Sequence, residues 1–414
     1  MNFPSFADAP GYIQLGEACA SALTSAAGNV FDSCYCSFRP IGIIFLYAIP
    51  SLMTDDPVQR VYISLFLNLL LFAATFFALR RLFFLDPGLK AIWGNLPPSL
   101  LGVIVFLPLL LNLISHLPVT LSDLPSLAFF MLAASQGTSI LFEDQPRARL
   151  WRYLSTGFLV SVSVLLKQSY IVYGFFLILS VLLLDRGQSN TSWTRIKNCS
   201  VFLLGMSPVL IQLINVYLHC GAFWLYEPGS LRALDYTRMR PNVETIYFSI
   251  PTPGAITVKV AGDIDYLSFI VLKLFKAMFG FEWSVYGGPS SSIHPFWALS
   301  YLNYVKSYGF VSLYAVFTFW NVLKAPRSLK LLNLTALLIA LFNSFFFHTE
   351  LRFYLFPRII FYVTVFFWLI LAVKRIRMAH CLPAWVRTRC GTDSPGLSGQ
   401  KCGGKSSSQN AEKL

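Results

Sequence analysis

The stretch VYISLFLNLLLFAATFFALRR, residues 61–81, decides the class of this protein. It contains no charged residue until Arg80 and Arg81. A helix that crosses a bilayer needs about 20 mostly apolar residues, because lipid offers no partner for an unpaired backbone group. Over the whole 414-residue chain 56% of residues are hydrophobic and only 12% are charged, against about 25% charged in soluble domains. The sequence therefore predicts an all-α, multi-pass membrane protein. It excludes a disordered chain, a disulfide-stapled secreted module and a nucleic-acid binder.

Further charge-poor stretches of the same kind predict about nine transmembrane helices. The two stretches on either side of Lys167 are short, so they are expected to form a tight hairpin that does not reach fully across the bilayer. The predicted spans are residues 61–79, 100–115, 124–142, 153–166, 168–184, 198–218, 307–322, 331–347 and 353–373.

The distribution of basic residues sets the orientation, because Lys and Arg gather in cytoplasmic loops. Most of the 32 Lys and Arg fall on the side that holds Arg80 and Arg81, so that side is predicted to be cytoplasmic. The net charge of +13 is then a signal of topology and not of a nucleic-acid partner. The resulting organisation is an external first loop (1–60), spans (61–218), a long external loop (219–306), further spans (307–373) and a basic, partly disordered cytoplasmic tail (374–414).

Each of the two external loops contains an apolar segment that is predicted to lie on the outer leaflet as an interfacial helix. In the first loop such a segment follows Arg39-Pro40 and is too short to span. In the long loop the segment is residues 266–286, where Lys273 and Lys276 stand among Leu, Phe and Trp.

The cysteines of the first loop are placed where a disulfide could form. If this loop is external, Cys19 can pair with Cys34 or with Cys36 in an oxidising compartment. Unpaired thiols are the equal alternative. The spacing of Cys34 and Cys36 does not match a redox motif or a zinc knuckle.

Ionisable side chains at the boundary of a membrane are costly to place there, so they are functional candidates. Asp8 is followed by Tyr12, and its alternative role is an ordinary helix cap. Asp123 opens a predicted span and has the same alternative. Lys167 lies in the outer turn of the short hairpin, where it either binds a phosphate or extends harmlessly towards water.

The most polar external turn is FFFHTELRFYLFPR, residues 345–358. An arginine can hold a phosphate with two parallel hydrogen bonds, and Glu350 can orient Arg352 for that purpose. The alternative is a solvated Glu–Arg pair. The polar and charged side chains of this turn are His348, Glu350, Arg352, Tyr354 and Arg358.

A divalent metal is left open, since two carboxylates separated by one residue can hold a cation that bridges a diphosphate. Asp263 and Asp265 in the long external loop have this spacing, although the pattern is short and common by chance.

The order of these motifs resembles the integral-membrane glycosyltransferases of the GT-C superfamily, in the bacterial branch related to lipid A aminoarabinose transferase and protein O-mannosyltransferase. The resemblance covers most of the chain, at the level of motif order. An acid, a Tyr and an Arg-Pro before an apolar helix are matched by Asp8, Tyr12 and Arg39-Pro40. A Ser-acid pair that opens a span is matched by Ser122-Asp123. A late E-x-R-Y-x-x-P turn is matched by the segment from Glu350 to Pro357, where Phe353 takes the Tyr position and Tyr354 follows it.

The resemblance implies transfer of a sugar from a polyprenyl-phosphate carrier to a lipid or glycan acceptor, at the periplasmic face of a bacterial inner membrane. It implies that Asp8 is the general base and that Lys167 and Arg352 contact the phosphate. The remaining candidate substrate-binding residues are Tyr12, Arg39, Asp123, His348, Glu350 and Tyr354.

Two departures from the family pattern stand at the start of the chain. Family members often have two adjacent acids in the first loop, whereas Asp8 is followed by Ala9. Members also begin with a span before this acid, so a tenth helix is expected upstream of Met1, or else the chain is a non-catalytic member. From a different class, a transporter or flippase for a lipid-linked glycan is the alternative function.

Overall fold

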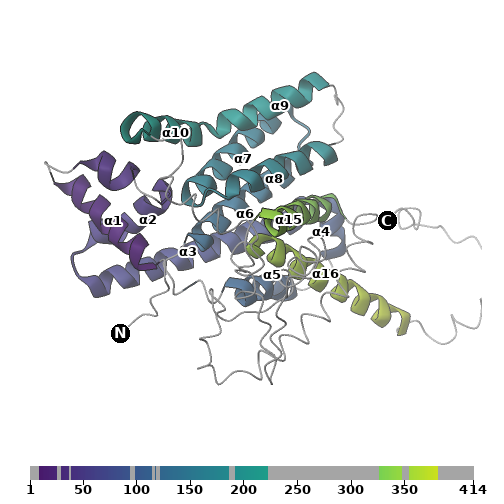
Figure 1. Ribbon diagram of the computed structural model, residues 1–414. Helices are drawn as coiled ribbons and strands as arrows, with labels where there is room; N and C mark the ends of the chain where they lie inside the picture. The colour runs from purple at the N-terminus through teal and green to yellow at the C-terminus, as the bar shows by residue number, and fades with distance from the viewer. Residues whose placement is uncertain are drawn as a thin grey trace, which may run out of the picture.

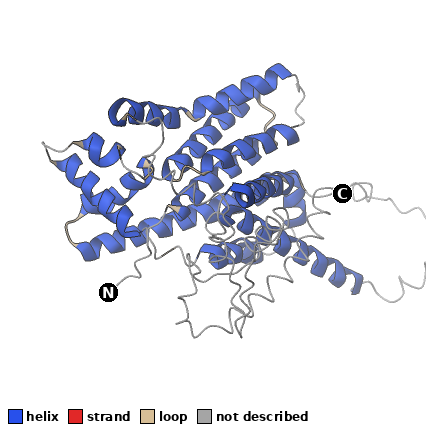
Figure 2. Cartoon of the chain, in the orientation of Figure 1, coloured by secondary structure: helices blue, strands red, loops and turns tan. Residues whose placement is uncertain are grey.

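The computed structural model describes residues 9–25, 29–36, 39–93, 98–113, 117, 122–185, 192–221, 326–346 and 354–380. Every regular element of this part of the chain is a helix, and it contains no strand (Figures 1 and 2). The first half contains α1 (Ala9–Thr24), a π-helical turn (Phe31–Tyr35), α2 (Ile41–Met53), α3 (Pro57–Leu85), α4 (Pro87–Trp93), α5 (Pro98–Leu113) and α6 (Asp123–Ile140). The rest contains α7 (Pro146–Leu166), α8 (Tyr170–Leu184), α9 (Ser192–Gly205), α10 (Ser207–Cys220), α15 (Arg327–Phe346) and α16 (Leu355–His380).

Among the helices of the described residues, two are long and apolar enough to cross a bilayer. They are α3 and the Leu355–Val373 part of α16. The helices α2 and α8 are apolar but shorter, and α9 with α10 passes the same test only as a bent pair. The predicted helical, apolar character is thus present, while the full set of nine spans stays a prediction. The predicted span 307–322, the predicted interfacial helix 266–286 and most of the tail lie outside the described residues.

Helix α6 lies at the centre of the bundle, where it packs against α3 and α7. Nearly all of its residues are buried, including several that carry hydroxyl groups. Three of these hydroxyls donate to carbonyls one turn earlier, from Ser126 to Ser122, from Thr138 to Ala134 and from Ser139 to Gln136. The buried hydroxyl of Ser135 has no hydrogen-bond partner among the described residues. Small hydroxyl residues let neighbouring helices approach α6 closely.

One end of the bundle is held by polar contacts between helix termini. Asp86 follows α3 and accepts hydrogen bonds at Oδ2 from the backbone N–H and the hydroxyl of Ser328, at 3.0 and 2.7 Å. Arg152 forms an ion pair with Glu143 at 2.7 Å, and its hydrogen bond lowers the pKa of that carboxyl. Arg149 lies 3.5 Å from Asp185. These contacts join the end of α3 to the start of α15, and the ends of α6 and α8 to the first turns of α7.

The predicted span 198–218 is not one straight helix. Its two halves, α9 and α10, are bent by 52° at Met206. Pro208 stands in the first turn of α10, where it has no N–H to donate and its ring would clash with the carbonyl of the preceding turn. Hydropathy alone did not reveal this break, because proline interrupts a helix without making the segment less apolar.

The pairing of α7 with α9 depends on two glycines. A Cβ added to Gly157 would lie 2.1 Å from the carbonyl oxygen of Phe202, and one added to Gly205 would lie 2.2 Å from that of Leu154. Figure 1 shows α9 running beside α7. Only glycine allows backbones to approach this closely.

We expect Gly157→Ala to lower the free energy of unfolding by about 1–3 kcal/mol, because the added methyl group must push α9 away. Gly102→Ala in α5 is the matched control, since nothing lies within 4 Å of the added Cβ. It should leave stability unchanged or raise it by up to about 1 kcal/mol. Thermal unfolding of the purified protein in detergent measures both variants, and equal losses would contradict the close contact.

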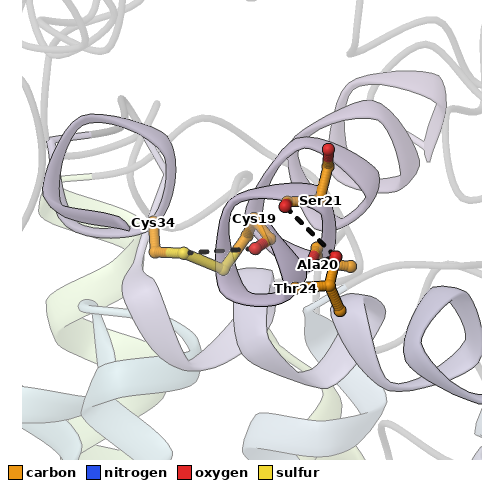
Figure 3. The surroundings of a disulfide bond; sticks show 5 residues. All are labelled: Cys19, Ala20, Ser21, Thr24 and Cys34. Atoms are coloured by element: carbon orange, nitrogen blue, oxygen red, sulfur yellow. Dashed lines mark hydrogen bonds between the residues drawn. A yellow bond between two sulfur atoms is a disulfide. The ribbon is translucent and has the colours of Figure 1, made fainter. Parts of the chain in front are cut away.

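Two disulfides hold the first loop. Cys19 pairs with Cys34, one of the pairings that the sequence left open (Figure 3). Cys36 pairs with Cys220, which was not anticipated because 184 residues separate the two. Cys220 is the last residue of α10, so this bond joins the first loop to the start of the predicted long external loop. Disulfides persist in oxidising compartments, which agrees with the external placement predicted for both segments.

We expect Cys36→Ser to expose one thiol more than the wild-type protein has, because Cys220 loses its partner. The thiols are counted as maleimide adducts by mass spectrometry of the unreduced, denatured protein. Cys199→Ser is the control and should remove one adduct, since Cys199 is a free cysteine. If Cys36 and Cys220 were both unpaired, Cys36→Ser would instead give one adduct fewer.

Candidate functional site

An ion pair between Asp123 and Lys167 lies at the end of the bundle opposite to Asp86. Asp123 is the first residue of α6, and Lys167 is in the turn between α7 and α8. The Lys167 Nζ lies 2.5 Å from Asp123 Oδ1. The Asp123 side chain is only 1% exposed and the Lys167 side chain 14%. A carboxylate and an ammonium group are therefore held together beside an apolar bundle, which is costly unless each keeps its partner.

The first loop reaches this ion pair through Tyr12. The Tyr12 hydroxyl lies 3.4 Å from the hydroxyl of Ser122, the residue directly before Asp123. The guanidinium of Arg39 stacks over the Tyr12 ring, 4.9 Å from the ring centre. A cation over an aromatic face is attracted by the electron density of the ring. Tyr12 thus links Arg39 to the start of α6, where Lys167 pairs with Asp123.

Close backbone contacts position the first loop. At Gly16 an added Cβ would lie 2.6 Å from the backbone of Tyr47, so α1 and α2 touch where Gly16 crosses α2. At Gly42 an added Cβ would lie 2.8 Å from the carbonyl oxygen of Leu165, two residues before Lys167. Helix α2 therefore packs on the end of α7, which brings Tyr47 close to Asp123, while Arg39 lies directly before α2 and stacks on Tyr12.

Tyr47 of α2 lies beside Tyr12 and near Asp123. Its ring centre lies 6.1 Å from that of Tyr12. Burial raises the pKa of Tyr47 well above its ordinary value, and Tyr12 and Asp123 raise it further. Tyr47 is therefore protonated at neutral pH, where it can donate a hydrogen bond but cannot act as a base.

An aromatic wall lies on the bundle side of the ion pair. The Phe130 ring packs edge-on against Tyr170 and Tyr173 of α8, at centroid distances of 5.3 and 5.9 Å, and against Phe356 of α16 at 4.8 Å. The Tyr173 hydroxyl accepts a hydrogen bond from Asn343 of α15 at 2.7 Å. Helices α6, α8, α15 and α16 thus meet at the same end of the molecule as the ion pair.

Five of the eleven predicted site residues lie in the described part of the chain, and four of them form one group. Tyr12, Arg39, Asp123 and Lys167 form the group just described, and Tyr354 is buried at the start of α16, two residues before Phe356. Six predicted residues lie outside the described part of the chain. These are the proposed base Asp8, the external-turn residues His348, Glu350 and Arg352, and the acids Asp263 and Asp265.

Arg358 was expected in an open polar turn, and this prediction is wrong. It lies inside α16, is 3% exposed, and donates from Nε to Asn112 Oδ1 of α5 at 3.0 Å. Helix formation begins at Leu355, so the guanidinium is carried into the bundle and not into the turn. This hydrogen bond joins α16 to α5.

Four residues were not predicted from the sequence as part of the site: Tyr47, Tyr173, Asn112 and Asn343. A usable signal was present for the two asparagines, because each is a lone amide in an apolar stretch and must find a partner when buried. For the tyrosines no such signal exists, since a tyrosine in an apolar helix is compatible with ordinary packing.

Within the described residues, no group of three or more His, Cys, Asp or Glu side chains could hold a metal ion. The metal pair Asp263 and Asp265 stays a prediction. Comparison with known proteins gave no match among family models, curated proteins or solved structures. The function is therefore inferred from the chemistry of the ion pair and of the residues around it.

We expect Lys167→Met to lower the free energy of unfolding by about 3–5 kcal/mol, because it leaves the Asp123 carboxylate buried without its cation. The double variant Asp123→Leu, Lys167→Met should be more stable than Lys167→Met alone. Thermal unfolding of the four members of this cycle in detergent gives the coupling energy.

The more exposed ion pair between Arg60 and Glu17 is the matched control, with side chains 24% and 44% exposed. Its coupling should not exceed about 1 kcal/mol. A coupling at Asp123 and Lys167 as small as that of the control would show that the pair is solvated and does not organise the site.

Proposed function

We propose that this protein is a multi-pass membrane glycosyltransferase of the GT-C type, which moves a sugar from a polyprenyl-phosphate donor to a lipid or glycan acceptor. The observation that supports this most is the Asp123–Lys167 pair, with Tyr12 and Arg39 of the first loop beside it, at one end of an apolar helical bundle. A lipid-linked sugar needs this combination of cations at a boundary and hydrocarbon next to it.

The cations have a defined task in this proposal. The donor phosphate binds near Lys167 and Arg39, while Arg352 of the external turn contributes a further contact. Lys167 is held by Asp123, so its ammonium group is kept in position before the donor arrives. Positive charge at this point stabilises the negative charge that grows on the phosphate as the sugar leaves.

The chemical step is a displacement at the anomeric carbon of the sugar. A hydroxyl of the acceptor attacks this carbon, and the bond between the carbon and the phosphate oxygen breaks. The electron pair of that bond leaves with the polyprenyl phosphate. The proton of the acceptor hydroxyl passes to the carboxylate of Asp8, the general base.

The proposal places about nine spans in a bacterial inner membrane, with the ion pair facing the periplasm. The disulfides of the first loop support this side, because the periplasm is an oxidising compartment. The opposite end carries Arg149 and Arg152, which support a cytoplasmic position by the positive-inside rule.

A transporter or flippase for a lipid-linked glycan is the second candidate function. The observation that favours it is the 52° break between α9 and α10, since interrupted helices are a feature of transporter folds. The charged pair argues for the enzyme, because it lies at the end of the helices and not at their midpoint.

We expect Asp8→Asn to lower sugar transfer by about 10²–10⁴-fold, because the acceptor hydroxyl loses its base. The assay incubates the purified protein with radiolabelled polyprenyl-phosphate sugars and measures consumption of the donor. Glu17→Gln is the matched control, since Glu17 is an acid of the same segment that pairs with Arg60. It should retain activity.

Full transfer by Asp8→Asn would remove Asp8 from this role. Net movement of a lipid-linked glycan across liposomes, with no glycosidic product in any assay, would favour the transporter instead.

A further inference from the structure

Two tryptophans stand exposed on neighbouring helices at the end of the bundle opposite to the candidate site. Trp151 of α7 is 70% exposed and Trp193 of α9 is 75% exposed. The two helices pack against each other through Gly157 and Gly205. Large aromatic side chains are normally buried, so this exposure marks a surface that contacts something other than water.

Both tryptophans lie at the same end of their helices. Arg149, near the start of α7, forms an ion pair with Asp185, the residue that ends α8. Helix α9 begins at Ser192, a short distance along the chain from Asp185. Trp193 is therefore carried to the end of the bundle where Trp151 lies.

Three exposed basic side chains lie within one helical turn of the two tryptophans in the sequence. They are Arg147 of α7 and Arg195 and Lys197 of α9. The acids Glu143 and Asp185 are engaged by Arg152 and Arg149. In the described part of the chain, neither Arg147 nor Lys197 forms an ion pair with an acid, and Asp144 is the exposed acid of this end. The net charge of the surface is positive.

An apolar strip continues from this charged surface along α9. Ile196, Leu203 and Leu204 are 56%, 63% and 64% exposed. A surface that is aromatic and basic at one end and aliphatic along its length matches the profile of a phospholipid. Tryptophan rings prefer the headgroup level, cations attract anionic headgroups, and aliphatic side chains lie against acyl chains.

We propose that Arg147, Trp151, Trp193, Arg195 and Lys197, which we name the Trp151–Trp193 surface, bind the headgroup of an anionic phospholipid. The charge complementarity of the surface selects this lipid over a zwitterionic one. The two rings fix the depth of α7 and α9 in the bilayer, and the basic side chains hold the lipid phosphate. This site is separate from the proposed transfer of a sugar, and neither depends on the other.

The experiment uses the full chain reconstituted in vesicles of phosphatidylcholine with a minor fraction of phosphatidylglycerol. Either the phosphatidylglycerol or an equal fraction of the phosphatidylcholine carries brominated acyl chains, which quench tryptophan fluorescence on contact. The chain has nine tryptophans, so the signal of the surface is the difference between the wild type and the Trp151→Phe, Trp193→Phe variant.

Brominated phosphatidylglycerol should quench this signal more strongly than brominated phosphatidylcholine at the same fraction. Each cation removed from Arg147, Arg195 and Lys197 by substitution with Gln should lower the preference about fivefold. The matched control is Arg80→Gln, Arg81→Gln, which removes two exposed cations of α3 that are not part of the surface. It should leave the preference unchanged.

Equal quenching by the two lipids would overturn the proposal. An equal loss of preference in the control would overturn it as well, since the attraction would then belong to the overall charge of the protein. Thermal unfolding of each variant shows whether it is folded, and substitution of an exposed basic residue should leave the unfolding temperature close to that of the wild type.

Discussion

The burial of the Asp123 carboxylate is the constraint on which the rest of the site depends. A carboxylate that is 1% exposed needs a cation, and the cation that it has is Lys167. Lys167 can reach it only because the turn between α7 and α8 lies over the start of α6. The end of α7, directly before this turn, contacts α2 at Gly42, and α2 in turn contacts α1 at Gly16. The first loop is thus attached to the bundle beside the buried ion pair.

Hydropathy predicted the helices well, because an apolar segment of sufficient length has few alternatives to a helix in lipid. Helices α3 and α16 are long and apolar enough to cross a bilayer, and α5, α6, α8 and α15 lie close to their predicted ranges. The pattern could not reveal the break at Met206, which comes from the local geometry of Pro208. It also could not pair Cys36 with Cys220, since the contact depends on how distant segments pack.

Within the site, ionisable residues were recognisable because a charge near lipid is rarely accidental. Asp123 and Lys167 were selected on this ground, and Tyr12 and Arg39 through the order of the motifs. The four lie in one group. What the residues alone could not say is that Asp123 and Lys167 are each other's partner. Tyr47 is a packing residue by every sequence criterion. The close packing of α2 on α1 at Gly16 and on α7 at Gly42 brings it near the ion pair. The buried ion pair thus lies at one end of the bundle, and the exposed basic surface lies at the other.

The most direct test of this account is to find which side of the membrane each segment faces. Single cysteines placed at Gln14 in α1, Gln168 beside Lys167, and Gln145 before α7 can be labelled with a membrane-impermeant maleimide in sealed vesicles of known orientation. The account predicts that Gln14 and Gln168 react from one side and Gln145 from the other. Reaction of Gln14 and Gln168 from opposite sides would contradict it, because the first loop and the Lys167 turn could then share no site.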